Sequence, residues 1–305
     1  MADQIPEDVI EFTRTIFDKA NTKATRALAR QPSAHEEMLD FQVFAALDEV
    51  GPCILESGIA VDIDTHWLGG RRHYDGRWEI ADIGIVIVLR RAGRMLWRKV
   101  ALLQSKRLYS REIPVVEMEL ADYRIGIGRL VDRTEDIPTR TEARRFKFDH
   151  ECVYGAMAAS SSQVKVIDAY IAKHNIPVYY SLYNPPTMPF EGTTPRPISS
   201  PSTSENHLGC RVLTSTQVHT VLSNLPVGRT PRFVEMIREA PAASTDPYDI
   251  HGWRFETFVA DEVMRCREGR LFERADDADL YALLYERTAP IASLIQISID
   301  MPGLD

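Results

Sequence analysis

A carboxylate, an amide and an ammonium group interrupt two apolar stretches in the middle of the chain. Asp82 lies near the beginning of the first stretch, and Gln104 and Lys106 end the second, with a short basic turn containing Gly93 between them. Apolar, β-branched runs around such a turn predict a β-hairpin of buried strands. Because side chains alternate along a strand, Gln104 and Lys106 point to one face, where Asp82 can join them. Such a set could hold a divalent cation and stabilise charge on a phosphate group.

Each of these residues also has a structural interpretation. Asp82 could cap a strand, and the Gln-Ser-Lys segment could be a solvated strand end that runs into Arg107. In an unrelated α/β binding module, Asp82 and Lys106 could form an ion pair. Singly, each residue is more often structural than catalytic, whereas the combination is more specific.

Helices and strands alternate around this predicted hairpin. Apolar residues at helical spacing predict helices, and strict alternation predicts strands. In chain order, the expected elements are helices over 6–29 and 33–50, a strand over 59–67, the hairpin over 80–103, a helix over 146–174 and a strand over 178–183. The order predicts an α/β fold, in which a helix and three strands precede a second helix and a fourth strand.

The pattern formed by Asp82 and the Gln-x-Lys segment resembles that of the PD-(D/E)xK nuclease superfamily, in its variant with Gln before the lysine. This superfamily includes restriction endonucleases and many phage-defence effectors. The resemblance covers roughly the middle half of the chain. It implies a restriction-endonuclease-like αβββαβ core with a mixed sheet flanked by helices, which agrees with the predicted order of elements.

The resemblance also implies an activity, a cofactor and roles for the matching residues. The expected activity is metal-dependent endonucleolytic hydrolysis of phosphodiester bonds in DNA, with RNA not excluded, and the expected cofactor is Mg²⁺, with Mn²⁺ as an alternative. The implied metal ligands are Asp82, Glu37 and the Ser105 carbonyl, while Gln104 would hold metal-bound water and Lys106 would orient the attacking water. Gln cannot supply the negative charge of the commoner Glu or Asp, so the helix carboxylate gains importance.

Two neighbouring glutamates are candidates for that helix carboxylate. Ser33 followed by Glu36 is a capping-box pattern, which would give Glu36 a structural role at the beginning of the second helix. We therefore prefer Glu37 as the functional acid and keep Glu36 as the alternative.

The uneven distribution of charge is compatible with nucleic-acid binding. The 305-residue chain has a formal net charge of −8, but basic residues outnumber acidic ones between Arg90 and Lys147. Phosphate binding depends on local potential, so Arg107 and Arg111 in this segment are candidate phosphate contacts. Between Glu235 and Asp305 the balance reverses, and this acidic segment suggests a protein partner or homo-oligomer, or a shield that weakens binding to free DNA.

Segment composition divides the chain into four parts. The predicted parts are an N-terminal helix (1–30), the nuclease-like core (31–185), a linker rich in Pro, Ser and Thr (186–208), and an acidic, mainly helical region (209–305). No apolar run reaches membrane-spanning length, no signal-peptide region is present, and the four cysteines are far apart. These features predict a cytoplasmic protein with reduced thiols and no membrane partner.

Two functions follow from the resemblance. The preferred one is the nuclease effector of a bacterial anti-phage defence or restriction system, acting with a partner protein. The alternative is a non-catalytic subunit in which a nuclease fold docks nucleic acid or a protein partner.

Overall fold

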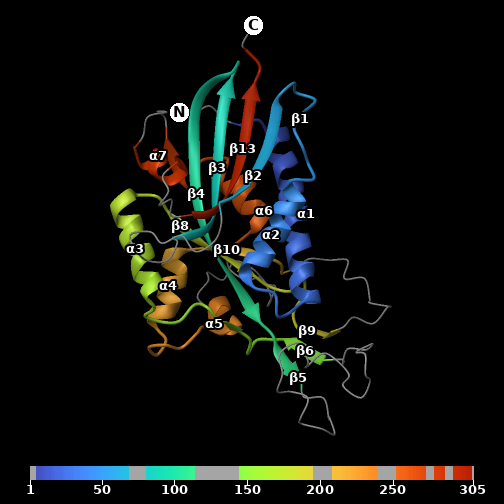
Figure 1. The fold of residues 1–305 in the computed structure, drawn as a ribbon, viewed down its shortest axis with the longest axis vertical. Coiled ribbons are helices and arrows are strands. Elements are labelled where there is room, and N and C mark those ends of the chain that lie inside the picture. Colours follow the sequence, from blue (N-terminus) through green and yellow to red (C-terminus); the bar gives the residue numbers. More distant parts are fainter. Residues whose placement is uncertain are drawn as a thin grey trace, which may run out of the picture.

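A computed structural model describes residues 5–68, 80–113, 144–194, 208–238, 252–272, 278–285 and 291–303. Within these residues, helices pack on both faces of a large mixed β-sheet (Figure 1). The α/β fold class is therefore confirmed. None of the described helices combines the length and the apolar character that crossing a membrane requires.

The described strands form one large sheet and one small one. In spatial order, the large sheet contains β1 (Cys53–Ile54), β2 (Ala60–Trp67), β13 (Ile291–Met301), β3 (Ala81–Arg91), β4 (Arg94–Tyr109), β8 (Val178–Tyr183), β10 (Arg211–Thr214) and β11 (Trp253–Arg254), while β7 (Val153–Tyr154) and β12 (Arg270–Phe272) also pair with β4. The small sheet contains β5 (Arg111–Ile113), β6 (Arg144–Phe148) and β9 (Phe190–Thr194).

The predicted hairpin is present as β3 and β4. Its two-residue turn places Ala92 at φ 47° and Gly93 at φ 74°, and positive φ at both positions matches the right-handed twist of the flanking strands. The register pairs Ile83 with Leu103 and continues to the turn with one irregularity. Strand β4 is longer than β3 and extends past its first residue, which leaves part of β4 free to contact other groups.

The last strand of the chain lies in the middle of the sheet. Strand β13 runs parallel to β3 and antiparallel to β2, so it separates the hairpin from β2, the strand that precedes it in sequence (Figure 1). The sequence predicts a mainly helical region over 209–305, and helices do occur there, but β13 makes that region part of the central sheet. Its isoleucines are buried and, from Ile295 onward, alternate with polar residues that are only partly buried, as expected for a strand with one face in the core.

The described helices cover the two faces of the sheet. They are α1 (Glu7–Arg30), α2 (Glu36–Leu47), α3 (Ser162–His174), α4 (Ser215–Ser223), α5 (Phe233–Arg238), α6 (Phe255–Thr257), the π-helix η4 (Phe258–Val263) and α7 (Ala278–Tyr285).

Neighbouring side chains of β8 identify the two helical layers. The Tyr179 ring packs on Phe258 of η4 with centroids 4.7 Å apart, whereas the Tyr180 hydroxyl lies 3.0 Å from His219 Nε2 of α4. Helices α1, α2, α6 and η4 thus lie on one side, and α3 and α4 on the other (Figure 1). Every residue of β8 is buried, as expected for a strand covered on both faces.

One expectation between β4 and β8 is wrong. The helix predicted over 146–174 begins only at Ser162, after Ser161 caps it by accepting a hydrogen bond from the Val164 N–H. The earlier residues form β6, because Phe146 alternates with Phe148 and both pack near Phe190 of β9. Strand β9 also falls inside the predicted linker, whose residues 195–207 lie outside the described part of the chain.

Candidate active site

Asp82 is the second residue of β3 and lies where this strand begins beside β4. Because Ile83 pairs with Leu103, Asp82 comes opposite Gln104. The Gln104 side-chain amide and the Ser105 backbone N–H both donate to Asp82 Oδ2, the second over 2.6 Å. The structure therefore brings the predicted aspartate and the Gln-Ser segment into direct contact.

Lys106 follows on the same strand and is only 5% exposed. Strand β4 pairs continuously with β8 here, with Ser105 beside Ser181 and Lys106 beside Leu182. This regular strand geometry places Gln104 and Lys106 on one face and Ser105 on the other, as the sequence predicts.

Asp40 reaches the opposite face of the same strand from α2. Its carboxylate Oδ1 accepts hydrogen bonds from Ser105 Oγ and from the Tyr183 hydroxyl, each over 2.7 Å. Ser105 Oγ also lies 3.0 Å from Ser181 Oγ. Asp40 is 2% exposed, so a carboxyl group is held in the core at the centre of a hydroxyl network.

The environment of Asp40 disfavours its negative charge. Burial raises the pKa of the Asp40 carboxyl well above its usual range, and the nearby charges of Asp82 and Glu36 raise it further. The hydrogen bonds from Tyr183 and Ser105 act in the opposite direction. A cation bound close to these acids would relieve both the repulsion and the cost of burial.

The structure favours Glu36 over Glu37 as the acid that α2 directs toward the site. Helix α2 begins at Glu36 with His35 as its N-cap, and no side-chain capping bond is formed, so the capping box predicted for Ser33 is absent. Glu36 and Asp40 are one helical turn apart and share a face. Glu36 Oε1 is buried without a hydrogen-bond partner among the described residues. Glu37 is exposed, and the structure does not bring it together with Asp82.

The two predicted phosphate contacts have different environments. Arg107 is 4% exposed, donates from Nη1 to the Pro32 carbonyl over 2.6 Å and stacks on the Tyr109 ring at 3.7 Å. A guanidinium engaged in this way has a structural role and little surface for a ligand. The side chain of Arg111 is 54% exposed and forms an ion pair with Asp149, so part of its charge is already balanced.

The oxygen atoms at this site are of the chemical kind that a hard divalent cation prefers. Gln104 Oε1, like Glu36 Oε1, is buried and has no hydrogen-bond partner within the described part of the chain. Among the described residues, no three His, Cys, Asp or Glu side chains are grouped closely enough to hold a metal ion. Amide, backbone and water oxygens would therefore have to complete a shell begun by carboxylates, and Mg²⁺ accepts such a shell because it keeps several waters.

Asp40 is the site residue that the sequence interpretation missed. It lies in the apolar face of α2 between Leu39 and Val43, where helical periodicity predicts another apolar side chain. An acidic residue at such a position is a signal that could have been recognised, because a buried carboxyl needs partners.

Comparisons with known proteins add no relative. The sequence matches no family model, and no significant similarity connects the chain to a curated protein or to a solved structure.

Proposed function

We propose that the protein is a metal-dependent endonuclease that hydrolyses phosphodiester bonds in DNA, with a fold related to the PD-(D/E)xK nucleases. The observation that carries this proposal is the junction at the start of β3. There Asp82 accepts hydrogen bonds from Gln104 and from the Ser105 backbone, while α2 supplies Glu36 and Asp40 from the adjacent layer. Three segments far apart in the sequence thus contribute the oxygen-rich groups that phosphodiester hydrolysis requires.

Each residue can be given a role in this reaction. Asp82 and Glu36 would hold Mg²⁺ or Mn²⁺ together with the Ser105 carbonyl, and Gln104 Oε1 would accept a hydrogen bond from a coordinated water. The cation would supply Lewis-acid stabilisation of charge on the phosphate. Lys106 would orient the attacking water and stabilise the same charge, which its burial strengthens by limiting competition from solvent.

The order of elements around the junction supports the same proposal. Helix α2, strands β2, β3 and β4, helix α3 and strand β8 occur in the order that the resemblance implies, with the short strands β1, β5, β6 and β7 between them, and β8 is parallel to β4. The structure departs from a simple version of that core because β13 lies between β2 and β3. This insertion leaves β3, β4 and β8 adjacent, so it does not separate the residues of the site.

The proposed biological role is that of the effector of a bacterial anti-phage defence or restriction system, which acts in the cytoplasm with a partner protein. It rests on the superfamily resemblance. A non-catalytic docking subunit is the second candidate. The observation that favours it is the lack, among the described residues, of three acidic side chains grouped for metal binding.

Plasmid cleavage tests the proposal. Purified protein, alone and with candidate partners, is incubated with DNA in Mg²⁺, Mn²⁺ or EDTA, and RNA serves as a second substrate. We expect metal-dependent cleavage that falls at least about a hundredfold in Asp82→Asn and in Lys106→Ala, because each removes several kcal/mol of charge stabilisation.

Asp62→Asn is the matched control for this experiment. Asp62 is an acidic residue of β2 outside the proposed site, so its substitution should leave cleavage within about twofold of wild type. Equal cleavage by wild type and Lys106→Ala would contradict the mechanism. DNA binding without cleavage, in the presence of partners, would favour the docking subunit.

A further inference from the structure

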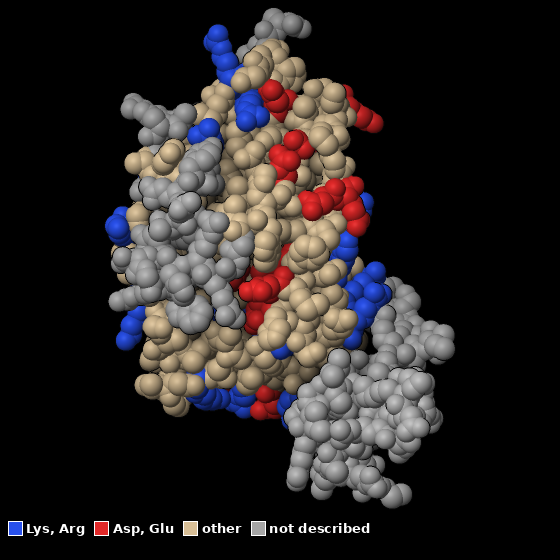
Figure 2. All heavy atoms as spheres, viewed as in Figure 1, with Lys and Arg blue, Asp and Glu red and all other residues tan. Residues whose placement is uncertain are grey.

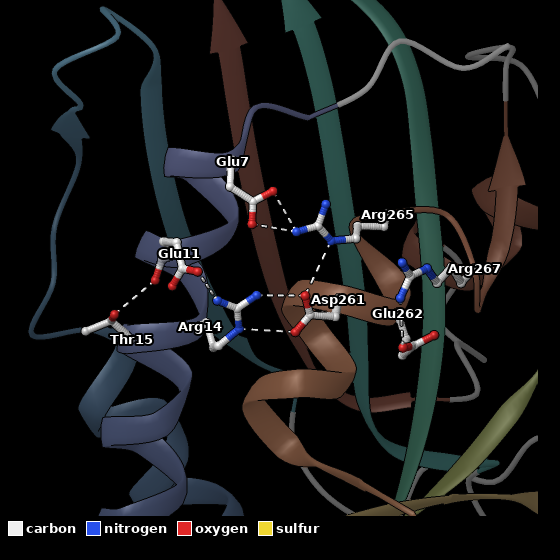
Figure 3. Close-up of polar contacts among 8 residues, drawn as sticks. All are labelled: Glu7, Glu11, Arg14, Thr15, Asp261, Glu262, Arg265 and Arg267. Carbon is white, nitrogen blue, oxygen red and sulfur yellow. Dashed lines mark hydrogen bonds and ion pairs between the residues drawn. The ribbon is translucent and has the colours of Figure 1, made fainter.

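Helix α1 has two halves of opposite charge. Its first half carries acidic residues that pair with arginines, such as Glu7 with Arg265, and the Arg14 guanidinium joins α1 to Asp261 of η4 (Figure 3). From residue 19 to its end, the helix carries only basic charged residues. The first half is thus an internal interface, while the second half concentrates positive charge.

Four cations of that second half form one stripe. Lys19, Lys23, Arg26 and Arg30 are spaced by four, three and four residues, which places them within an arc of roughly 60° on the helix. The stripe is about 16 Å long at the rise of an α-helix. The helix dipole favours cations only within the last turn, so it accounts for Arg30 but not for Lys19.

These cations line a groove between α1 and α2 with a volume of about 580 Å³. Met38, Leu39 and Gln42 of α2 form part of its wall, and none of the described residues that line it is acidic. Figure 2 shows basic side chains gathered at the right-hand edge of the molecule, level with the lower half of α1 in Figure 1. In a chain of net charge −8, this concentration needs an explanation.

Internal ion pairs do not account for the whole stripe. Lys23 contacts Glu49 at 2.7 Å, and Arg26 also has an interaction within the protein. Lys19 and Arg30 are exposed, and neither side chain has an ion-pair or hydrogen-bond partner among the described residues. Two cations, at opposite ends of the groove, are therefore available to a ligand.

We propose that this groove binds the sugar-phosphate backbone of double-stranded DNA. The proposal deepens the proposed function and rests on it for the choice of ligand. A stripe of about 16 Å matches the axial rise of about five base pairs of duplex DNA, and a row of fixed cations suits the regular repeat of its phosphates. The exposed side chain of Met38 in the wall can contact the sugars.

The position of the groove relative to the site supports this ligand. Arg30 and Gln31 line the end of the groove where α1 stops. The next residue, Pro32, accepts the hydrogen bond from Arg107, which directly follows Lys106. A backbone lying along the stripe would therefore approach the strand that carries the proposed catalytic lysine.

DNA binding by a double variant tests the inference. Lys19→Glu combined with Arg30→Glu is compared with Lys165→Glu combined with Lys173→Glu, which changes the net charge equally at two exposed lysines of α3. Affinity for a fluorescent DNA duplex is measured by anisotropy in EDTA over a range of KCl concentrations. We expect the groove variant to bind at least about tenfold more weakly, with a salt dependence reduced by about two ions, and the α3 variant to bind nearly as wild type.

Three results would overturn the inference: unchanged binding by the groove variant, equal weakening by both variants, and no DNA binding by wild type. The first result would stand against a DNA groove even if an acidic protein were found to bind there.

Asp82→Asn separates this inference from the proposed function, because this variant should lose cleavage and keep DNA binding. If the groove variant binds normally while Asp82→Asn loses cleavage, the groove is wrong and the nuclease stands. If the groove variant binds weakly while Asp82→Asn still cleaves, the groove stands and the proposed mechanism is wrong.

Discussion

Acidic residues gather at two places along the same sheet, and the two places differ in burial. At the beginning of β3, the half-buried Asp82 accepts a hydrogen bond from the backbone of β4 and lies near the buried Asp40. Toward the opposite end of β3, Asp62, Asp64 and Asp300 line a cavity of about 500 Å³. The positions of Asp82 and the partner of Asp300 on β3 are separated by roughly 26 Å along the strand.

Both ends of the sheet have several acidic residues, so the number of acids does not distinguish the candidate site from the far end. Solvent can stabilise the acids at the far end, where Asp64 is exposed and Asp300 accepts a hydrogen bond from the hairpin turn at Gly93. At the near end, protein groups must replace the solvent, and two buried oxygens still have no partner among the described residues. Buried acceptors of this kind are costly unless a ligand satisfies them.

Removing Asp40 should have the largest effect on stability. Asp40→Ala takes the acceptor away from the buried Tyr183 hydroxyl and leaves a small cavity, so we expect the free energy of unfolding to fall by about 2–4 kcal/mol. Asp62→Ala should lower it by less than about 0.5 kcal/mol. Urea denaturation in EDTA at pH 7 measures both. Equal losses would mean that the two acidic regions do not differ as burial implies.

The neighbouring glutamates of α2 provide a sharper comparison within the site. Glu36→Gln keeps the shape of a side chain whose oxygen is buried but removes its charge, so DNA cleavage should fall about 10- to 100-fold. Glu37→Gln changes an exposed side chain and should remain within about twofold of wild type. Cleavage rates measured across Mg²⁺ concentrations distinguish weaker metal binding from a slower reaction. The reverse ranking would restore Glu37 as the helix carboxylate.

Local patterns were sufficient to predict the hairpin but not the sheet around it. Continuous apolar runs and a glycine-containing turn define β3 and β4 without reference to the rest of the chain. The insertion of β13 between β2 and β3 depends on pairing across more than 200 residues, and no local pattern encodes it. The sequence does not predict strand β6, because Phe146 and Phe148 can also be read as apolar residues of the longer helix expected over 146–174.

In the candidate site, too, local patterns predict some of the contacts and not others. The contacts of Asp82 with Gln104 and Ser105 follow from strand register, which the sequence interpretation anticipated. The choice of Glu37 depended on a capping box that does not form. The burial of Arg107 on Tyr109 could not be anticipated, because alternation gives a face of the strand but not the helix connection that covers it.

The pH dependence of the free energy of unfolding compares the cost of ionising one buried acid in each region, Asp40 and Asp62. The pKa of Asp40 is raised in the folded protein, so in metal-free wild type the unfolded chain releases this proton at a lower pH than the folded one. Relative to Asp40→Asn, wild type should therefore lose stability as the pH rises from about 4 through the folded pKa.

The pKa of Asp62 is also raised, first by burial and then by Asp64, so Asp62→Asn should shift the same curve in the same direction. Its partial exposure to solvent should limit the shift to a few tenths of a kcal/mol. Denaturation of wild type and both variants in EDTA between pH 4 and 8 gives the two differences. If Asp40→Asn shows no pH-dependent difference from wild type, then Asp40 ionises without cost, and burial does not set the near end of the sheet apart from the far end.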